Sequence, residues 1–269
     1  PPDPRRRTAR ALAPAESARH ATDAATAART TMPDHLMLLV AGAAVAGFVQ
    51  GVSGFAFGMV SLSIWAWGIE PRLAVVLSVA GGLSGQVLSA FTVRRGLQLA
   101  TLWPYLAGAL AGIPLGVLAL PHLDATSFRL GLGLLLVVFC PLMLVADRLP
   151  AITAGGRAAD ALVGMAGGVM GGLGGFTGVV PSLWATLRRY DKDLQRAVLQ
   201  NFNLAALAAT LLSYVATGTI TTAMLPALAV VLPALVIPSL LGARVYRGMS
   251  PLAFRRVVLL LLSASGAVM

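Results

Sequence analysis

Long apolar runs alternate with short charged stretches along most of this chain. Eight apolar segments can be drawn, at 36–68, 72–93, 97–120, 128–146, 159–187, 194–217, 223–246 and 252–269. A helix needs about 20 apolar residues to cross the hydrocarbon core of a bilayer. The pattern therefore predicts an all-α polytopic membrane protein with about eight hydrophobic segments.

Two of these segments, 36–68 and 159–187, are too long for one straight helix. Each carries a Gly-rich run with the spacing GxxGxxxG near its middle, Gly51–Gly58 in the first and Gly171–Gly178 in the second. Unwound backbone at membrane depth is tolerated only where it lines a cavity or is buried in protein. Each long segment is therefore predicted to be two half-helices joined by an unwound or re-entrant turn, where a transporter's substrate would bind.

The chain repeats internally. Three markers recur in the same order: the Gly-rich run, an apolar stretch (Ala74–Ser78, then Ala197–Asn201), and a glycine followed by Phe-Arg (Gly116 with Phe128, then Gly242 with Phe254). Such recurrence indicates two four-element repeats. We expect a tail at 1–33, a first membrane repeat at 34–146, a linker at 147–158 and a second membrane repeat at 159–269.

Charge changes the picture of the topology. The net charge is +10, and most basic residues outside the tail lie in short loops, which is typical of membrane topology rather than nucleic-acid binding. Eight full crossings would put Arg148 and Arg188 on opposite sides of the membrane. Both face the cytoplasm if each half crosses an odd number of times, so inverted repeats with re-entrant Gly-broken segments are expected.

The tail before the first apolar segment is rich in Arg and Ala and has almost no large apolar side chains. Such a composition gives little to offset ordering entropy, so residues 1–33 are predicted to be disordered. Inverted repeats would place this tail outside the cytoplasm. Two explanations stay open, a start assigned upstream of Met32 and a genuine cytoplasmic tail.

Candidate binding residues cluster at the two glycine breaks and in the helices that follow them. Exposed N–H groups at half-helix N-termini would suit a small oxyanion, and amides offer donors without bringing a fixed charge into lipid. The alternative is purely structural, because small residues let helices approach closely and polar side chains bond neighbouring helices. The predicted substrate-binding residues are Gln50, Gly51, Ser53, Gly54, Phe55, Gly58, Gln86, Gly171, Gly174, Gly175, Thr177, Gly178, Asn201 and Asn203.

Enzymatic chemistry is not expected. The runs that begin at Gly51 and Gly82 match the GxSG of intramembrane serine proteases, but such a protease needs a histidine base, and His20, His35 and His122 all lie outside the apolar segments. The single cysteine, Cys140, excludes an internal disulfide and a thiolate metal cluster. We therefore expect no cofactor, no metal and no nucleic-acid partner.

The first broken segment, Gly47–Gly58, its counterpart at Gly171–Pro181 and the four-plus-four layout resemble the TauE/SafE family of sulfite exporters. The resemblance covers nearly all of 34–269 and implies a multi-pass permease of the bacterial inner membrane, with sulfite or an organosulfonate as substrate. We expect export of a small anion by alternating access. The sequence leaves open another small-anion carrier, a channel, a non-transporting scaffold, and a homo-oligomer.

Overall fold

The computed structural model of the chain describes residues 35–92, 96, 98–246, 259 and 262–263. The chain divides into two compact units, 1–38 and 39–269. The first contributes only residues 35–38 to the described part, as the beginning of a helix. The predicted tail at 1–33 lies outside the described residues, as does nearly all of the last apolar segment. The arrangement that follows concerns the second unit.

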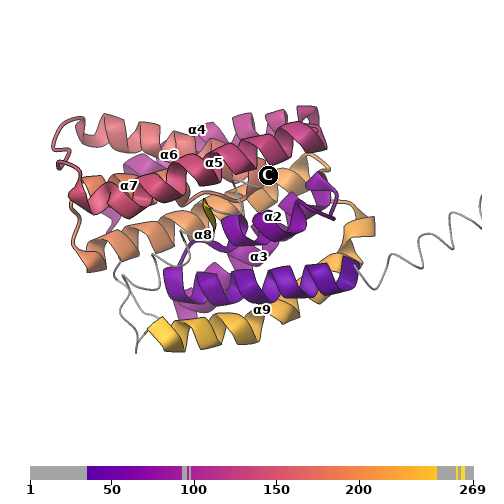
Figure 1. The fold of residues 1–269 in the computed structure, drawn as a ribbon. Coiled ribbons are helices and arrows are strands. Elements are labelled where there is room, and N and C mark those ends of the chain that lie inside the picture. The colour runs from indigo at the N-terminus through magenta and orange to yellow at the C-terminus, as the bar shows by residue number, and fades with distance from the viewer. Residues whose placement is uncertain (1–34, 93–95, 97, 247–258, 260–261, 264–269) are drawn as a thin grey trace, which may run out of the picture. The chain divides into compact units, whose positions relative to one another are not determined.

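Helices form all of the regular secondary structure in the described residues, in agreement with the predicted all-α class. Their order is shown in Figure 1. After a helix at His35–Ser53 come α2 (Phe57–Trp65), α3 (Pro71–Thr92), α4 (Leu99–Ala119), α5 (Ala125–Val145), α6 (Gly156–Gly174), α7 (Val179–Leu187), α8 (Lys192–Ala216) and α9 (Leu225–Tyr246). Three 3-10 turns, η1 (Leu120–His122), η2 (Ala146–Arg148) and η3 (Thr222–Met224), lie in the links.

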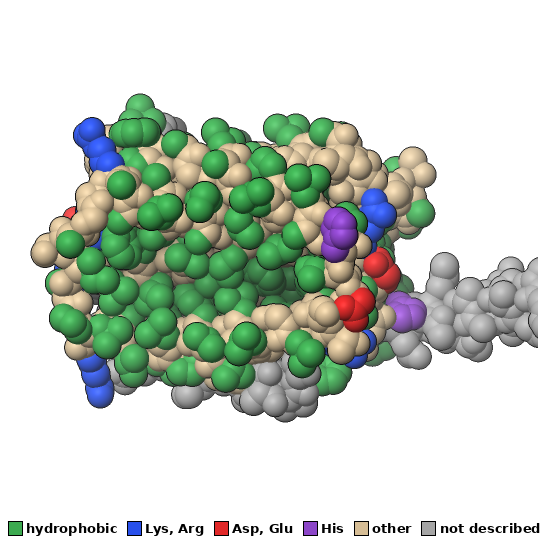
Figure 2. All heavy atoms as spheres, turned by 90° about the horizontal axis from the view of Figure 1, so that it is seen from above, with side chains coloured by type: hydrophobic (Ala, Val, Ile, Leu, Met, Phe, Trp, Pro, Cys, Tyr) green, Lys and Arg blue, Asp and Glu red, His purple; other side chains and the backbone are tan. Residues whose placement is uncertain are grey.

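Six of the described helices are long and apolar enough to cross a membrane, with mean hydropathies from 1.3 to 2.3. They are His35–Ser53, Pro71–Phe91, Leu99–His122, Ala125–Val145, Asp193–Ala216 and Thr222–Val245. Figure 2 shows one face of the molecule covered by hydrophobic side chains, with charged side chains gathered toward its two ends. This distribution matches a hydrocarbon core between two polar interfaces. The chain is a multi-pass membrane protein.

Both over-long segments are broken at a glycine. The helix at His35–Ser53 has 19 residues and is followed by Gly54 with φ of 87° and then by the nine residues of α2. In the second case α6 has 19 residues and is followed by Gly175 with φ of 77° and then by the nine residues of α7. Glycine meets a need of the backbone here, because other residues rarely adopt this left-handed conformation. The two broken segments therefore match in the lengths of their helices and in the left-handed glycine between them.

In each broken segment the short helix turns back along the long one. Gly42 lies directly against the Trp65 ring, which leaves no room for a Cβ, so α2 returns beside the helix that precedes it. In the second segment a Cβ on Gly167 would lie 2.7 Å from the Thr177 carbonyl oxygen. There the Trp184 indole N–H of α7 donates to the carboxylate of Asp160, near the start of α6, at 2.7 Å. Each broken segment is a helical hairpin.

The contact between α4 and α6 is built from glycine on both sides. Three glycines of α4, spaced four residues apart, lie against the backbone of α6. Three glycines of α6 with the same spacing lie against the backbone of α4 in return. Small residues at this spacing let two membrane helices approach to backbone contact. The six residues are Gly108, Gly112 and Gly116 in α4, and Gly164, Gly168 and Gly172 in α6.

The helix links gather at two ends of the bundle. At one end, which we call the Arg72 end, the Arg72 guanidinium donates to the carbonyls of Gly218 and Thr219, so the start of α3 meets the α8–α9 link. At the other, the Arg188 end, the Arg188 guanidinium donates to the Thr153 carbonyl and that of Arg189 donates to the Leu149 carbonyl. The α5–α6 and α7–α8 links therefore lie together.

Candidate functional site

The two glycine breaks meet inside the bundle. The Ser78 hydroxyl of α3 donates to the Gly174 carbonyl at 2.9 Å, and both groups are buried. A Cβ built on Gly58 would lie 3.0 Å from the Gly175 carbonyl oxygen. A Cβ on Gly178 would lie 3.0 Å from the Cβ of Phe55. Residues that are 96 or more positions apart in the chain thus form one contact region.

The second break presents hydrogen-bond donors. Gly178 is the N-cap of α7 and provides no side-chain cap, so the first N–H groups of that helix have no capping side chain. Beside it lies Asn203 of α8, 1% exposed, whose amide oxygen accepts from the Thr177 hydroxyl at 2.8 Å. The Asn203 Nδ2 has no partner, although it is buried. An unpartnered buried donor at the positive end of a helix is suited to bind an anion.

The first break presents acceptors. The Gln50 side-chain amide of the first helix donates to the Gly82 carbonyl at 2.9 Å, and the Gln86 amide of α3 donates to the Gly54 carbonyl at 2.6 Å. The Oε1 atoms of both glutamines are buried without a partner. The Ser53 hydroxyl accepts from the N–H groups of Phe55 and Ala56 at 3.4 and 3.3 Å. The two breaks thus differ in polarity.

Several of the predicted residues have a packing or local role. Gly51 lies against the backbone of Ser239, and a Cβ on Gly171 would lie 2.6 Å from the Thr177 methyl group. A Cβ on Gly174 would overlap the ring of Phe176. The Asn201 amide donates to the Ala197 carbonyl of its own helix at 3.0 Å. Asn203, rather than Asn201, is the α8 amide in contact with the second break.

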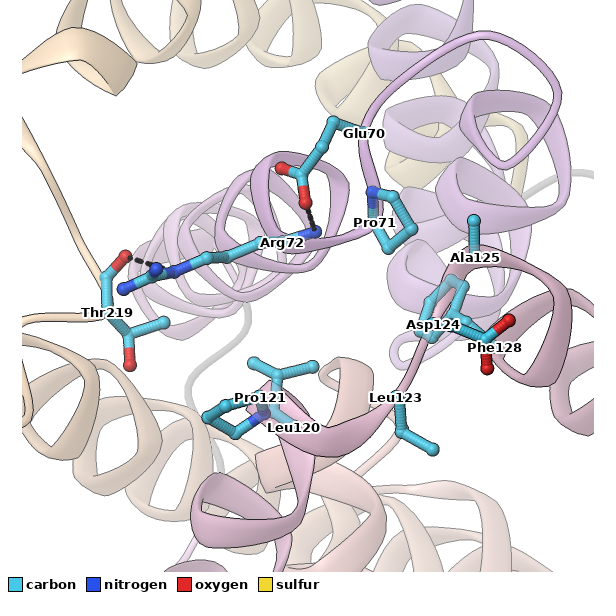
Figure 3. Close-up of a pocket in the computed structure, with 10 residues that line it drawn as sticks. All are labelled: Glu70, Pro71, Arg72, Leu120, Pro121, Leu123, Asp124, Ala125, Phe128 and Thr219. Carbon is cyan, nitrogen blue, oxygen red and sulfur yellow. Dashed lines mark hydrogen bonds between the residues drawn. The ribbon is translucent and has the colours of Figure 1, made fainter.

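A pocket of about 410 Å³ lies away from the breaks, at the Arg72 end. Figure 3 shows Arg72 reaching across it toward Thr219, with Leu120, Pro121 and Leu123 on the facing link. Its carboxylates already serve as helix caps, since Glu70 accepts from the N–H groups of α3 and Asp124 from those of α5. None of the residues that line this pocket has a buried side-chain donor without a partner, so the pocket has no feature that favours it as an anion site.

Asp160 is a buried carboxylate near the start of α6. It is 5% exposed and accepts from the Tyr105 hydroxyl at 3.2 Å and from the Trp184 indole at 2.7 Å. The Arg188 guanidinium lies 3.9 Å from its other oxygen. Its partners come from α4 and α7, so only tertiary structure reveals the cluster. Ser78 was missed as well, because a serine in an apolar helix most often bonds within its own helix.

Two Gly-broken hairpins that meet among buried amides, inside a bundle of membrane-spanning helices, define a membrane transporter. A family model described as Sulfite exporter TauE/SafE matches residues 39–269. The chain therefore belongs to the TauE/SafE family, as its glycine motifs indicated, and that family implies a membrane transporter of sulfite or related anions. Neither the comparison with curated proteins nor that with solved structures gives a match for this chain.

Proposed function

We propose that this protein exports a small sulfur-containing anion, sulfite or an organosulfonate, across the bacterial inner membrane by alternating access. The observation that carries the proposal is the unpartnered Nδ2 of Asn203 beside the N-terminus of α7. A buried amide donor without a partner costs about 1–3 kcal/mol, a penalty that a bound oxyanion would relieve. The helix terminus adds a positive partial charge at the same point.

The anion would bind between the two breaks. Phe55 brings the first break to within contact of Gly178, and Ser78 joins α3 to the end of α6. The N-termini of α2 and α7 both begin within a few residues of these contacts, and neither has a side-chain cap. Thr177 holds Asn203 through its hydroxyl and so leaves the amide nitrogen free to donate. These four features support a shared site rather than one site in each half.

We infer inverted repeats from the direction of the two hairpins. The first hairpin returns to the Arg72 end, where α3 begins, since Trp65 packs beside Gly42 and Arg72 bonds the α8–α9 link. The second returns to the Arg188 end, where α8 begins, since Trp184 bonds Asp160. If neither hairpin crosses the membrane, each half crosses an odd number of times and the halves are inverted. Alternating access by rocking of two inverted halves is a known consequence of such symmetry.

The Arg188 end is proposed to face the cytoplasm. Its links and the first turns of the helices beside them carry a concentration of basic residues, among them Arg148, Arg157, Arg188, Arg189 and Arg196. Such residues favour the cytoplasmic side. An inside-negative potential favours expulsion of an anion by about 2.3 kcal/mol per charge per 100 mV. Export of a monovalent anion would therefore need no further energy source at ordinary membrane potentials.

The experiment is sulfite efflux from proteoliposomes that hold the full chain, with a potassium gradient and valinomycin setting the potential. Wild-type protein should give saturable efflux that an inside-negative potential accelerates. Asn203→Asp keeps an acceptor for the Thr177 hydroxyl but replaces the free donor with a negative charge, so efflux should fall at least tenfold, since hydrogen bonds to charged groups contribute about 1.5–3 kcal/mol.

Asn201→Asp is the matched control, because it makes the same change on the same helix at an amide that bonds only its own helix. Efflux through this variant should stay near that of the wild type. Equal efflux through both variants would contradict the proposed site. Efflux that does not saturate would indicate a channel, competition by another anion would identify a different carrier, and no flux from folded protein would favour a scaffold.

A further inference from the structure

Two backbone N–H groups just after the helix His35–Ser53 do not donate to the carbonyls at its C-terminal end. In a continuing helix the N–H groups of Phe55 and Ala56 would donate to the carbonyls of Gly51 and Val52. Here both donate to the Ser53 hydroxyl instead. The carbonyls of Gly51 and Val52 are therefore freed from their helical donors at the first break. At the second break the Gly172 carbonyl, which stands three residues before the left-handed glycine as Gly51 does, accepts from the Tyr214 hydroxyl at 2.7 Å.

Two side-chain oxygens add to these freed carbonyls. A carbonyl can only accept, so the bonds from Gln50 to Gly82 and from Gln86 to Gly54 fix which end of each amide is nitrogen. The Oε1 atoms must then point elsewhere, and both are buried without a partner, in side chains that are each 1% exposed. The Gln50 amide lies against Gly85, and the next residue, Gln86, bonds the Gly54 carbonyl, so both amides lie between the first break and the same turn of α3.

The first break also has room. A Cβ built on Gly54 would meet nothing within 4 Å, although the Gln86 nitrogen bonds the carbonyl of the same residue. Open space beside several oxygen acceptors suits a small ligand that binds either as a cation coordinated by oxygen or as a hydrogen-bond donor.

We propose that the first break binds a monovalent alkali cation through the Oε1 atoms of Gln50 and Gln86 and the freed carbonyls of Gly51 and Val52. Hard cations prefer oxygen ligands, and the C-terminal end of a helix carries a partial negative charge. The site contains only neutral ligands, which suits a single positive charge better than a divalent ion. Among the described residues no group of three His, Cys, Asp or Glu side chains is placed to hold a metal.

This inference goes beyond the proposed export of an anion and does not depend on it, because cation binding can be measured without a transported substrate. It places the cation at the acceptors of the first break, beside the proposed anion site between the two breaks. A cation at the first break would also lower the electrostatic cost of bringing an anion to the same depth of the membrane.

The test is the melting temperature of the purified full chain in detergent, titrated with NaCl or KCl at an ionic strength held constant with choline chloride. Binding to the folded state raises the melting temperature in a way that depends on ligand concentration and affinity. We expect a rise that saturates with the alkali salt and is absent with choline. Gln50→Leu and Gln86→Leu should abolish it. Gln195→Leu should retain it, since Gln195 bonds Thr186 in the second half of the chain.

A second measurement covers the case in which the glutamine variants do not fold. Equilibrium binding of radioactive sodium to the wild-type chain should be saturable and displaced by unlabelled NaCl but not by choline chloride. The inference is overturned if NaCl, KCl and choline chloride stabilise the protein equally and no saturable sodium binding is found, in which case water satisfies the glutamine oxygens. Sulfite efflux is measured separately and does not depend on this result. Failure of the cation site and failure of the export proposal are therefore distinguishable.

Discussion

The Ser78 hydroxyl donates to the Gly174 carbonyl across 2.9 Å, and this buried bond joins α3 to the last residue of α6. Gly174 is the final helical residue before the second break, so its carbonyl lacks the helical donor that an interior residue would have. Ser78 supplies that donor from the other half of the chain. The bond therefore fixes the second break against the helix that follows the first.

Ser78→Ala should destabilise the protein by about 1–3 kcal/mol, because it leaves the buried Gly174 carbonyl without a donor. Thermal unfolding in detergent measures the change. Ser84→Ala is the control, since the Ser84 hydroxyl bonds the Ala80 carbonyl of its own helix, and that carbonyl keeps its helical donor when the hydroxyl is removed. A Ser78→Ala variant as stable as Ser84→Ala would show that the bond between the halves contributes little.

Alanine at either break should slow transport without removing the protein from the membrane. Gly54 and Gly175 have φ of 87° and 77°, a conformation that costs other residues about 1–2 kcal/mol each. Sulfite efflux per folded molecule should fall for Gly54→Ala and for Gly175→Ala. Gly131→Ala serves as the control, because Gly131 lies within α5 and a Cβ there meets nothing within 4 Å. Unchanged efflux in all three variants would remove the breaks from the mechanism.

The sequence predicted the broken segments because a bilayer limits helix length and glycine marks where a helix can unwind. It could not predict which glycine turns the chain. The shared spacing pairs Gly54 with Gly174, whereas the left-handed residue of the second break is Gly175. The neighbouring glycine is helical, and this choice depends on the Ser78 bond and on the Phe176 ring packed beside it. Such contacts are long-range and leave no local pattern.

The same limit applies to Asn203. Asn201 and Asn203 are equally polar and lie two residues apart, so composition and spacing do not distinguish them. Their side chains point in different directions on α8. Only Asn203 reaches Thr177 and so contacts the break. The α4–α6 contact was missed for a different reason. Its glycines repeat every fourth residue in both helices, and this spacing is visible in the sequence. The spacing does not identify which helix is the partner.

Gly112→Val should prevent close packing of α4 on α6. A Cβ at this position would overlap the Met165 carbonyl, and backbone cannot move aside as a side chain can. Overpacking of this kind costs about 1–3 kcal/mol or more. We expect a loss of monodisperse protein in size-exclusion chromatography after extraction. Gly131→Val, at a position where a Cβ meets no neighbour within 4 Å, should elute like the wild type. An unaltered profile for Gly112→Val would mean that the two helices can separate without cost.

Acid should weaken the cap that Asp124 forms on α5. A hydrogen bond from the Ser127 side chain and others from the N–H groups of Thr126 and Ser127 lower the pKa of the Asp124 carboxyl. Because the pKa in the folded state is below that in the unfolded state, the stabilisation is complete above the unfolded pKa and is lost as the pH falls through the folded one. The difference in melting temperature between wild type and Asp124→Ala should therefore shrink as the pH falls below about 4. A difference that is constant with pH would show that the charge plays no part.

Asp160 should stabilise the base of the second hairpin. Asp160→Ala leaves the Tyr105 hydroxyl and the Trp184 indole without their acceptor, at a cost of about 1–3 kcal/mol. Asp160→Asn should cost less, because an amide oxygen can still accept both bonds and only the pairing with Arg188 is lost. Melting temperatures should therefore fall in the order wild type, Asn, Ala. Asp193→Asn, a change at an exposed residue of α8, should have little effect. If Asp160→Ala has the same melting temperature as Asp193→Asn, the cluster forms without stabilising the hairpin. In that case α7 must be held to α6 by its glycine contacts alone.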